Sequence, residues 1–172
     1  MNAKIIFKNK RNYNGELIGD ILVKSRKNLK SIDCPKSLNS AAIDEFLIIF
    51  LVAAKAKGVS SFYDLGELNN KESPRLDIAL RFLKMIGVKY ERNNYNIRIF
   101  GNPDLKLKGY YKVNNFNKDH RVFMMSSIAA LSLGGKWKIY DKDSIKTSFP
   151  NFIKKIKELG AKLSWKEEMI LL

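Results

Sequence analysis

The sequence predicts an α/β protein in which helices lie inside and strands form the outer sheets. Two segments with helical character, 41–55 and 122–133, are apolar over most of their circumference, as expected of helices that are buried on nearly every side. The segments with strand character are less apolar than these helices. Because the most apolar elements belong in the core, we expect the helices to form the inside of the fold.

An internal repetition supports this fold class. Residues 83–89 and 156–162 share a pattern of helix, glycine and strand, and a buried helix and a short strand precede each copy. The unit strand–helix–strand–helix–strand–strand is therefore expected about twice. No linker of disordered composition separates the copies. We expect residues 1–172 to form a single unit with repeats at roughly 16–100 and 101–172.

The N-terminal half begins with two predicted strands, at 4–8 and 16–25, which the turn-prone residues 12–15 join. A helix is expected over 41–55, ending before Gly58. The next helix has apolar residues on one face, with Ser73 as N-cap, Pro74 in the first helical position and Gly87 after its end. The apolar face of this helix consists of Leu76, Ala79, Leu80, Leu83 and Ile86. A strand at 59–63 precedes the helix, and a hairpin of 88–90 with 96–100 around Asn93 and Asn94 follows it.

The C-terminal half repeats the same kinds of element. A helix over 122–133 ends at Gly134, and a last helix begins at Pro150 and ends before Gly160. One face of that last helix carries Phe152, Ile153, Ile156 and Leu159. Strands are expected at 106–113, 137–140 and 161–165.

Composition excludes several classes of protein. Cys34 is the single cysteine and His120 the single histidine of the 172 residues, which excludes a disulfide framework and a Cys-rich or His-rich metal site. The longest apolar run, 46–54, is shorter than the ~20 residues that span a bilayer. We see no signal peptide, and we expect a soluble, cytoplasmic protein without metal and without membrane attachment.

The net charge of +15, from 32 Lys and Arg against 17 Asp and Glu, favours an anionic partner. Nucleic acid, a phosphorylated metabolite and an anionic membrane surface all meet that description. The excess is mostly lysine spread over the whole chain, and no aromatic-rich RNA-binding signature accompanies it. The pattern therefore does not favour nucleic acid, which stays the third alternative.

Four loop-to-helix junctions carry residues that can do chemistry. Free N–H groups and the helix dipole make a helix N-terminus attractive to anions, and four N-termini at one place would form a single anion site. Taken singly, each motif has an ordinary explanation; Glu72 and Arg75, for example, could form a surface ion pair worth about 0.3 kcal/mol. The junctions are Asp44–Glu45, Lys71–Glu72–Ser73–Pro74–Arg75, Asp119–His120–Arg121 and Lys146–Thr147–Ser148–Phe149–Pro150.

Together, in this order and spacing, the four motifs resemble the C-terminal portion of the 5-enolpyruvylshikimate-3-phosphate synthases, also called 3-phosphoshikimate 1-carboxyvinyltransferases. The similarity covers about residues 5–163 and includes the strand motif at 15–21, with Gly15, Gly19 and Asp20. The related UDP-N-acetylglucosamine enolpyruvyl transferases share the fold but not this set. The resemblance implies a partial inside-out α/β barrel of the enolpyruvyl transferase type.

The resemblance also implies an activity. These enzymes transfer the enolpyruvyl group of phosphoenolpyruvate to the 5-hydroxyl of shikimate 3-phosphate and release phosphate, by addition and elimination, without metal or cofactor. The matching catalytic positions would be Asp44 for the hydroxyl proton and Glu72 for the methylene carbon, with His120 in support. Arg75 and Arg121 would hold phosphoenolpyruvate, Lys71 would lie near shikimate 3-phosphate, and Lys146 would be a further ligand of phosphoenolpyruvate.

The sequence departs from the family pattern in places. Pro74 stands where an acidic residue is usual, Asn69 and Asn70 replace Arg-Val, and Lys146 lies one position early, with Thr147 in its place. The family has two domains of three repeats, so this chain would be a fragment, inactive alone, with an exposed apolar helix face. We expect it to join the missing N-terminal part of the enzyme or to self-associate. The alternative is an inactive relic kept as an anion-binding or interaction module.

Overall fold

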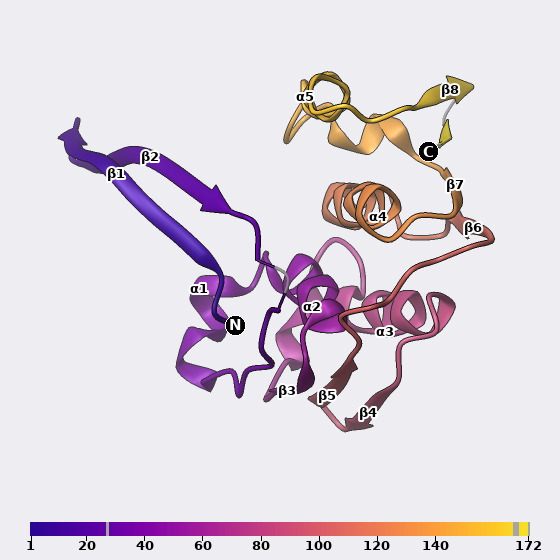
Figure 1. Cartoon of the computed structure of the whole chain (residues 1–172), viewed down its shortest axis with the longest axis horizontal. Helices are drawn as coiled ribbons and strands as arrows, with labels where there is room; N and C mark the ends of the chain where they lie inside the picture. Colours follow the sequence, from indigo (N-terminus) through magenta and orange to yellow (C-terminus); the bar gives the residue numbers. More distant parts are fainter. Residues whose placement is uncertain (27, 167–168, 172) are drawn as a thin grey trace.

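The computed structural model describes residues 1–26, 28–166 and 169–171, and its strands form three separate sheets (Figure 1). The first contains β1 and β2, the second has the order β3–β5–β4, and the third has the order β6–β7–β9–β8. In the described part of the chain, no single helix is long and apolar enough to cross a membrane; a pair of helical segments, 36–42 and 46–55, passes by length and composition but is bent by 120°.

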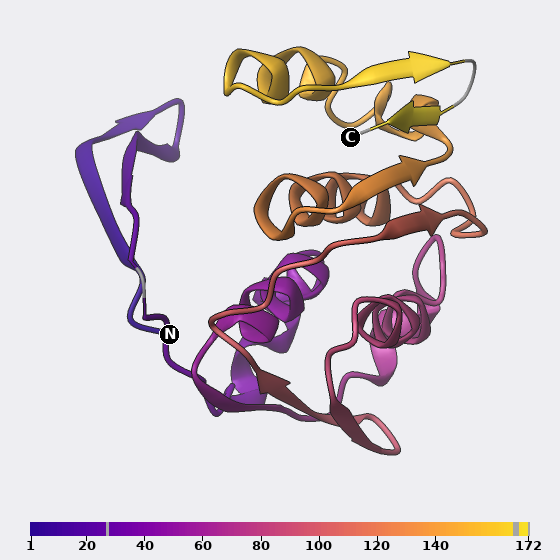
Figure 2. The ribbon, with the colours of Figure 1, turned by 45° about the vertical axis from the view of Figure 1, so that its right-hand side comes forward.

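The first sheet is an antiparallel hairpin of β1 (Lys4–Tyr13) and β2 (Glu16–Lys24) that projects away from the helices (Figure 2). The pair Tyr13 and Glu16 closes it, and the two loop residues have φ angles of 50° at Asn14 and 87° at Gly15, as a tight hairpin turn requires. Both predicted strands are confirmed. β1 is longer than predicted because a bulge between Lys8 and Arg11 lets the pairing continue to the turn.

The predicted continuous helix over 41–55 is wrong at its start. The structure has η1 (Lys36–Leu38), α1 (Asn39–Ala42) and then α2 (Phe46–Lys55). The break contains Asp44 and Glu45. The Asp44 carbonyl oxygen accepts a hydrogen bond from Arg121 at 2.9 Å, a contact outside the local helical ladder. From Phe46 onward the helix is apolar and mostly buried, as predicted.

The strands of the second sheet come before and after the predicted amphipathic helix in the chain. β3 (Gly58–Phe62) leads through η2 (Gly66–Asn70) to α3 (Arg75–Met85), which precedes β4 (Tyr90–Asn93) and β5 (Asn96–Gly101). All five residues of the predicted helical face are buried. Gly87 ends the turn with a φ of 74°, and the Val88 N–H donates to the Leu83 carbonyl at 2.9 Å, the bond of a glycine C-cap.

The strands of the third sheet also alternate with helices along the chain. The elements in order are β6 (Tyr110–Val113), α4 (His120–Leu133), β7 (Lys136–Ile139), η3 (Lys142–Ile145), α5 (Phe152–Glu158), β8 (Ser164–Lys166) and β9 (Met169–Leu171). β6 and β8 cover only parts of the strands predicted at 106–113 and 161–165. The prediction that Leu159 belongs to the apolar face of the last helix is wrong. Leu159 is 86% exposed because the helix turns at Gly160, where the Ala161 N–H bonds the Ile156 carbonyl.

The second and third sheets have corresponding strand orders. β5 pairs antiparallel with both β3 and β4, and β9 pairs antiparallel with both β7 and β8. On the far side of β7 lies the parallel strand β6. At the equivalent place beside β3, Lys30 and Asp33 form parallel bridges with Lys57 and Ser61.

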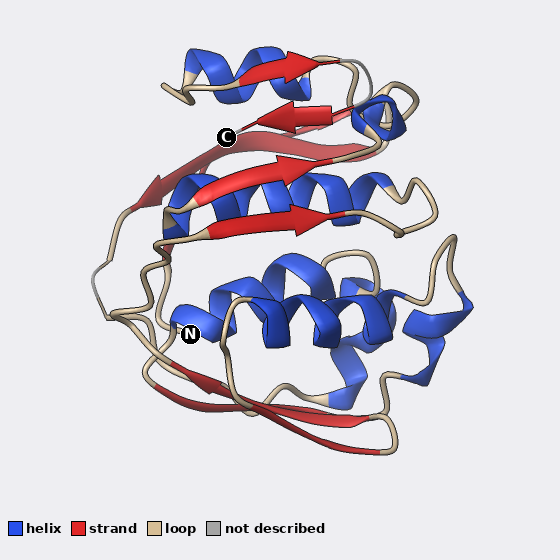
Figure 3. Cartoon of the chain, turned by 90° about the vertical axis from the view of Figure 1, so that its right-hand side faces the viewer, coloured by secondary structure: helices blue, strands red, loops and turns tan. Residues whose placement is uncertain are grey.

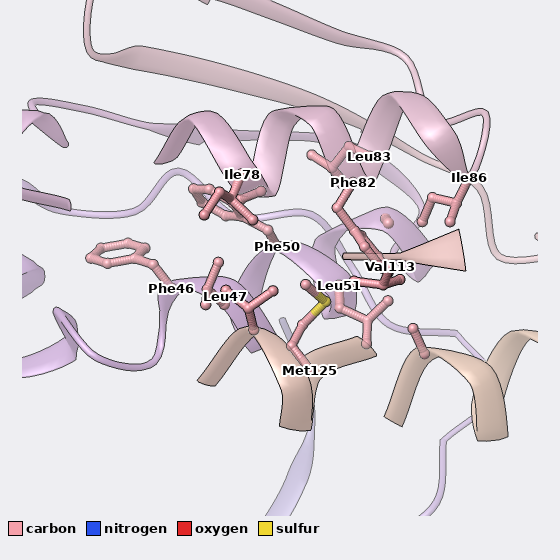
Figure 4. Packing of buried hydrophobic residues seen from close by; sticks show 14 of the residues in the cluster. Phe46, Leu47, Phe50, Leu51, Ile78, Phe82, Leu83, Ile86, Val113 and Met125 are labelled. Carbon is pink, nitrogen blue, oxygen red and sulfur yellow. The ribbon is translucent and has the colours of Figure 1, made fainter. Parts of the chain in front are cut away.

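The helices form the inside, as the sequence predicts. α2, α3 and α4 contact one another, and helices cover one face of the second and third sheets (Figure 3). The strands alternate accordingly, with Ile97 and Ile99 of β5 and Ile139 of β7 fully buried on the helix side. Figure 4 shows the centre of this core, to which α2 contributes Phe46, Leu47, Phe50 and Leu51, α3 contributes Ile78, Phe82 and Leu83, and α4 contributes Met125. This packing brings the N-terminal ends of α2, α3 and α4 together.

Candidate functional site

The N-terminus of α3 is capped by a residue of the preceding 3₁₀ helix, η2. Asn69 Oδ1 accepts the backbone N–H groups of Leu76 at 3.1 Å and Asp77 at 3.3 Å. The predicted cap, Ser73, makes no such bond, and Pro74 has a ψ of 75° and lies just outside the helix. The prediction of Ser73 as N-cap is wrong because its buried hydroxyl donates to Asp119 Oδ2 at 2.8 Å instead.

The N-terminus of α4 is capped by Asp119, which adopts an extended conformation before the helix. Its Oδ1 accepts the Arg121 N–H at 2.9 Å. Its Oδ2 accepts both the Ser73 hydroxyl and the Arg75 Nε–H, each at 2.8 Å. Asp119 is 1% exposed, so one buried carboxylate ties the first turns of α3 and α4 together.

Arg75 lies at the centre of the site and holds three carboxylates. Besides Asp119 on Nε, its Nη1 donates to Asp44 Oδ1 at 2.7 Å and its Nη2 donates to Glu72 Oε2. The Arg75 side chain is 1% exposed, whereas those of Asp44 and Glu72 are 46% and 59% exposed. A buried guanidinium therefore aims two accessible carboxylates toward one place on the surface.

Arg121 links the same site to the start of α2. Its Nη2 lies 3.2 Å from Asp44 Oδ2, and its Nη1 lies 3.0 Å from Glu45 Oε1. Asp44 therefore contacts Arg75 through one carboxylate oxygen and Arg121 through the other. We name this set the carboxylate–arginine cluster; its members are Asp44, Glu45, Glu72, Arg75, Asp119 and Arg121.

The cluster changes the acidity of its members. For both Asp44 and Asp119, burial opposes ionisation, but hydrogen bonds and positive charge from arginine outweigh it and lower the pKa. Lys71 and Arg121 add to the lowering at Asp44, and Ser73 adds to it at Asp119. For Arg75, burial opposes the charge, but Asp119, Asp44 and Glu72 prevail and raise the pKa. All three groups are therefore charged at neutral pH.

The other predicted site residues differ in their placement. Lys71 Nζ lies 3.3 Å from Glu67 Oε1, and the positive charge of Lys71 contributes to the lowered pKa of Asp44. His120 opens α4 next to Asp119, but among the described residues its side chain has no hydrogen bond to Glu72 or to an arginine. Lys146 lies outside the cluster; its side chain is 70% exposed and pairs with Asp143 at 2.9 Å.

Sequence reasoning missed the structural importance of Asp119, Ser73 and Glu45. Asp119 lies shortly before the helix predicted at 122–133, and an aspartate near a helix start is a candidate N-cap residue, so this pattern could have identified its carboxylate. For Ser73, the N-cap pattern predicted a bond to its own helix, whereas its hydroxyl bonds Asp119. The contact between Glu45 and Arg121 joins residues 76 positions apart, and no local pattern indicates it.

The geometry indicates what the cluster can do. Each terminal nitrogen of a guanidinium has two N–H groups, so Arg75 and Arg121 keep donors for an anion while they hold the carboxylates. A hollow of ≈180 Å³ opens beside Asp44, Glu45 and Arg121. The other residues that line this hollow are apolar. A larger hollow of ≈730 Å³ lies over β6 and β7 and shares no lining residue with the cluster. Among the described residues, no group of three His, Cys, Asp or Glu is arranged to hold a metal ion.

Comparisons with known proteins identify one family. The profile of the family described as EPSP synthase (3-phosphoshikimate 1-carboxyvinyltransferase) matches residues 16–156. A 3-phosphoshikimate 1-carboxyvinyltransferase of Ruthia magnifica subsp. Calyptogena magnifica is 35% identical over 168 residues, covering 95% of this chain and 37% of the relative. One of Zymomonas mobilis is 39% identical over 163 residues, covering 94% and 36%.

Solved structures show the same fold. An EPSP synthase from Acinetobacter baumannii has a TM-score of 0.85 and 28% identity, covering 97% of this chain and 38% of that chain. A second structure of the enzyme from this organism has a TM-score of 0.83 and 31% identity, covering 92% and 36%. The predicted fold, a partial inside-out α/β barrel of the enolpyruvyl transferase type, is confirmed. The chain spans a little more than a third of the length of the curated relatives that it matches.

Proposed function

This chain belongs to the EPSP synthase family, and on that premise we propose that it supplies part of an active site that transfers the enolpyruvyl group of phosphoenolpyruvate to the 5-hydroxyl of shikimate 3-phosphate. The observation that carries the proposal is the buried Arg75, which orients the accessible carboxylates of Asp44 and Glu72 at one place. Two positioned carboxylates are what a reaction that moves two protons needs.

Three carboxylates of the cluster then have roles. Glu72 gives a proton to the methylene carbon of phosphoenolpyruvate while the substrate hydroxyl attacks its neighbouring carbon. Asp44, ionised because of its lowered pKa, accepts the proton of that hydroxyl. The Glu72 carboxylate then takes a methyl proton back while phosphate leaves with the proton held by Asp44, and this elimination restores the double bond. Asp119 is a positioning residue, since it holds Arg75 and thereby both carboxylates.

The cations of the site hold the substrates. Arg121 and the remaining N–H groups of Arg75 bind the carboxylate and phosphate of phosphoenolpyruvate, for which guanidinium geometry is well suited. Lys71 lies near the phosphate of shikimate 3-phosphate. His120, whose side chain bonds no arginine in the described structure, supports the adjacent Arg121 only once the substrates are bound. Lys146 completes the phosphoenolpyruvate site once its ammonium leaves Asp143. The roles of these residues require neither metal nor cofactor.

The activity requires a partner. The chain spans 37% and 36% of the first relatives, and a site whose other half is absent neither aligns two substrates nor excludes water. We therefore expect negligible turnover by the chain alone. Its partner is the remaining portion of such an enzyme or a second copy of the chain, and we place the reaction in the cytoplasm.

One observation favours a second candidate, an inactive relic kept as an anion-binding or interaction module. Nε, Nη1 and Nη2 of Arg75 each already contact a carboxylate, and these contacts stabilise the fold whether or not substrate binds. On this candidate, anions bind near Arg121 without turnover.

The test is reconstitution. The chain is mixed with the uncovered remainder of the Zymomonas mobilis enzyme, made as a separate polypeptide, and phosphate release from phosphoenolpyruvate with shikimate 3-phosphate is followed. We expect no release by either part alone and release by the mixture. Glu72→Gln should lower the rate by about 10²–10⁴-fold. The matched control is Glu91→Gln on β4, whose exposed side chain pairs with Arg98; its rate should stay within about twofold of wild type.

Three results contradict the proposal in different ways. Phosphate release by the chain alone would show that no partner is needed. A mixture that forms a complex and binds shikimate 3-phosphate but releases no phosphate would support the inactive module. Release that Glu72→Gln leaves unchanged would remove Glu72 from the mechanism.

A further inference from the structure

The β1–β2 hairpin exposes an apolar face. Cross-strand pairs of Ile5 with Val23 and Phe7 with Ile21 lie on one face of the hairpin, and Leu17 lies on the same face near the turn. Figures 1 and 2 show the hairpin projecting away from the helices. The exposed fractions are large for side chains of this kind: 50% for Ile5, 58% for Phe7, 68% for Leu17, 63% for Ile21 and 66% for Val23.

Such a face requires a partner. A two-stranded hairpin is at best marginally stable in water, and a contiguous apolar patch on a protein surface marks a site of interaction. The base of this hairpin is fixed, since the Lys30 N–H donates to the Met1 carbonyl at 3.1 Å. The sequence predicted an exposed apolar face on a helix, but the largest group of exposed apolar side chains in the described structure lies on these strands.

The other two hairpins of the chain show what covers such a face. In β4–β5 the closing pair is Asn93 with Asn96, and the next residue, Ile97, is fully buried beneath the helices. In β8–β9 the residue after Met169 is Ile170, which is also fully buried. The equivalent residue of the first hairpin, after the closing residue Glu16, is Leu17. The face that contains Leu17 therefore corresponds to the helix-covered face of both other sheets.

The same comparison identifies the free edge. In both larger sheets the second strand of the hairpin pairs with a further antiparallel strand: β5 pairs with β3, and β9 pairs with β7. β2 pairs with β1 alone among the described strands. An antiparallel strand leaves alternate N–H and C=O groups pointing away from its first partner, so β2 presents a ready edge for a strand.

We propose that this hairpin is the docking surface for a strand and helix of the enzyme portion that the chain does not span. The added strand pairs antiparallel with β2, and the helix covers the face of Ile5, Phe7, Leu17, Ile21 and Val23. Two observations identify the occupant. The chain covers 38% of a solved EPSP synthase, so most of such an enzyme lies outside it. In this chain, each of the other two hairpins pairs with a further strand and packs against helices of the same repeat unit. The first repeat in this chain then begins after β2, and not at residue 16 as predicted.

The inference rests on the partner that the proposed function requires, but not on any catalytic role. Binding is therefore measured without substrates, by sedimentation of the full chain with the uncovered remainder of the Zymomonas mobilis enzyme. The double variant Ile21→Asn, Val23→Asn should weaken binding at least tenfold. The matched control, Asp20→Asn, Lys24→Asn, alters the opposite face of the same strand and should change binding less than twofold. Hydrogen exchange should show new protection of alternate β2 amides in the complex.

A second format does not require a soluble remainder: both parts are co-expressed, and capture of the untagged part by the tagged chain is measured with the same variants. Equal binding by both double variants would overturn the inference, as would unprotected β2 amides in a stable complex. Homodimers that the apolar-face variant abolishes, with no complex with the remainder, would assign the surface to a second copy instead. A complex that forms through β2 without turnover would contradict the proposed function alone.

Discussion

The α3–α4 junction and the η3–α5 junction have similar contacts but very different environments. At the first, Arg75 Nε lies 2.8 Å from Asp119 Oδ2, and both side chains are at most 1% exposed. At the second, Lys146 Nζ lies 2.9 Å from Asp143 Oδ2, with exposures of 70% and 54%. The separations differ by 0.1 Å, so distance does not distinguish the two ion pairs. Burial does.

The difference has a physical cause. Water hydrates the exposed Lys146 and Asp143 nearly as well when they are apart, so their pairing contributes little. Asp119 and Arg75 have lost water on folding, and each needs the hydrogen bonds of the other. The buried pair therefore fixes the positions of Asp44 and Glu72, whereas the exposed pair leaves its lysine free to rearrange. Only the first junction is a preorganised site.

The largest expected effect comes from breaking the buried pair. Asp119→Ala leaves Arg75 buried without one of its three carboxylates and removes the cap of α4, so we expect the free energy of unfolding to fall by about 3–5 kcal/mol. Asp143→Ala, the matched change at the exposed pair, should cost at most about 1 kcal/mol. Urea unfolding followed by circular dichroism measures both. Similar losses for the two variants would show that burial does not set the difference.

Acid should reveal the same contrast. The folded-state pKa values of Asp44 and Asp119 lie below the ordinary aspartate value of about 4, so the unfolded chain binds more protons in acid. The stabilisation is complete above that ordinary value and is lost as the pH falls through it toward the folded-state values. We expect the free energy of unfolding to decline below about pH 5. Asp119→Asn should reduce this decline, and Asp143→Asn should not. An equal decline in all three proteins would contradict the assignment.

The smallest effect compares two serines. Ser73 Oγ donates to Asp119, whereas Ser144 Oγ, at the exposed junction, is buried without a hydrogen-bond partner among the described residues. Ser73→Ala should cost about 1–2 kcal/mol because Asp119 loses a charge-assisted bond. Ser144→Ala should be neutral or slightly stabilising, since it removes an unsatisfied buried hydroxyl. Thermal unfolding of the two variants gives the comparison, and a larger loss for Ser144→Ala would reverse it.

Much of the fold followed from local patterns. The five apolar positions of α3 recur with the period of a helix, and Gly87 ends that helix with a positive φ that glycine adopts at little cost. The break between α1 and α2 did not follow, because the contacts between Asp44 and two arginines that accompany it come from distant segments. Leu159 was misplaced because a single residue decides whether a helix continues or turns.

The candidate site was predicted as a set of residues but not as a set of contacts. The order of the four motifs identified Asp44, Glu72, Arg75 and Arg121, which the structure does bring together. The sequence placed Lys146 one position away from the family pattern, and in the structure Lys146 pairs with Asp143 outside the cluster. The catalytic and binding roles of these residues stay predictions until the reconstituted protein is measured.

The sequence by itself determined the period of each helix, the turns of the hairpins, the placement of helices inside sheets and the family, because all of these depend on residue types at short or fixed spacings. The tertiary structure alone decided that Asp119 holds Arg75 across 44 positions, that Ser73 serves Asp119 instead of its own helix, and that one face of β1–β2 is bare. Burial and electrostatic strength depend on which distant segments exclude water from a group, and that is a property of the packed chain.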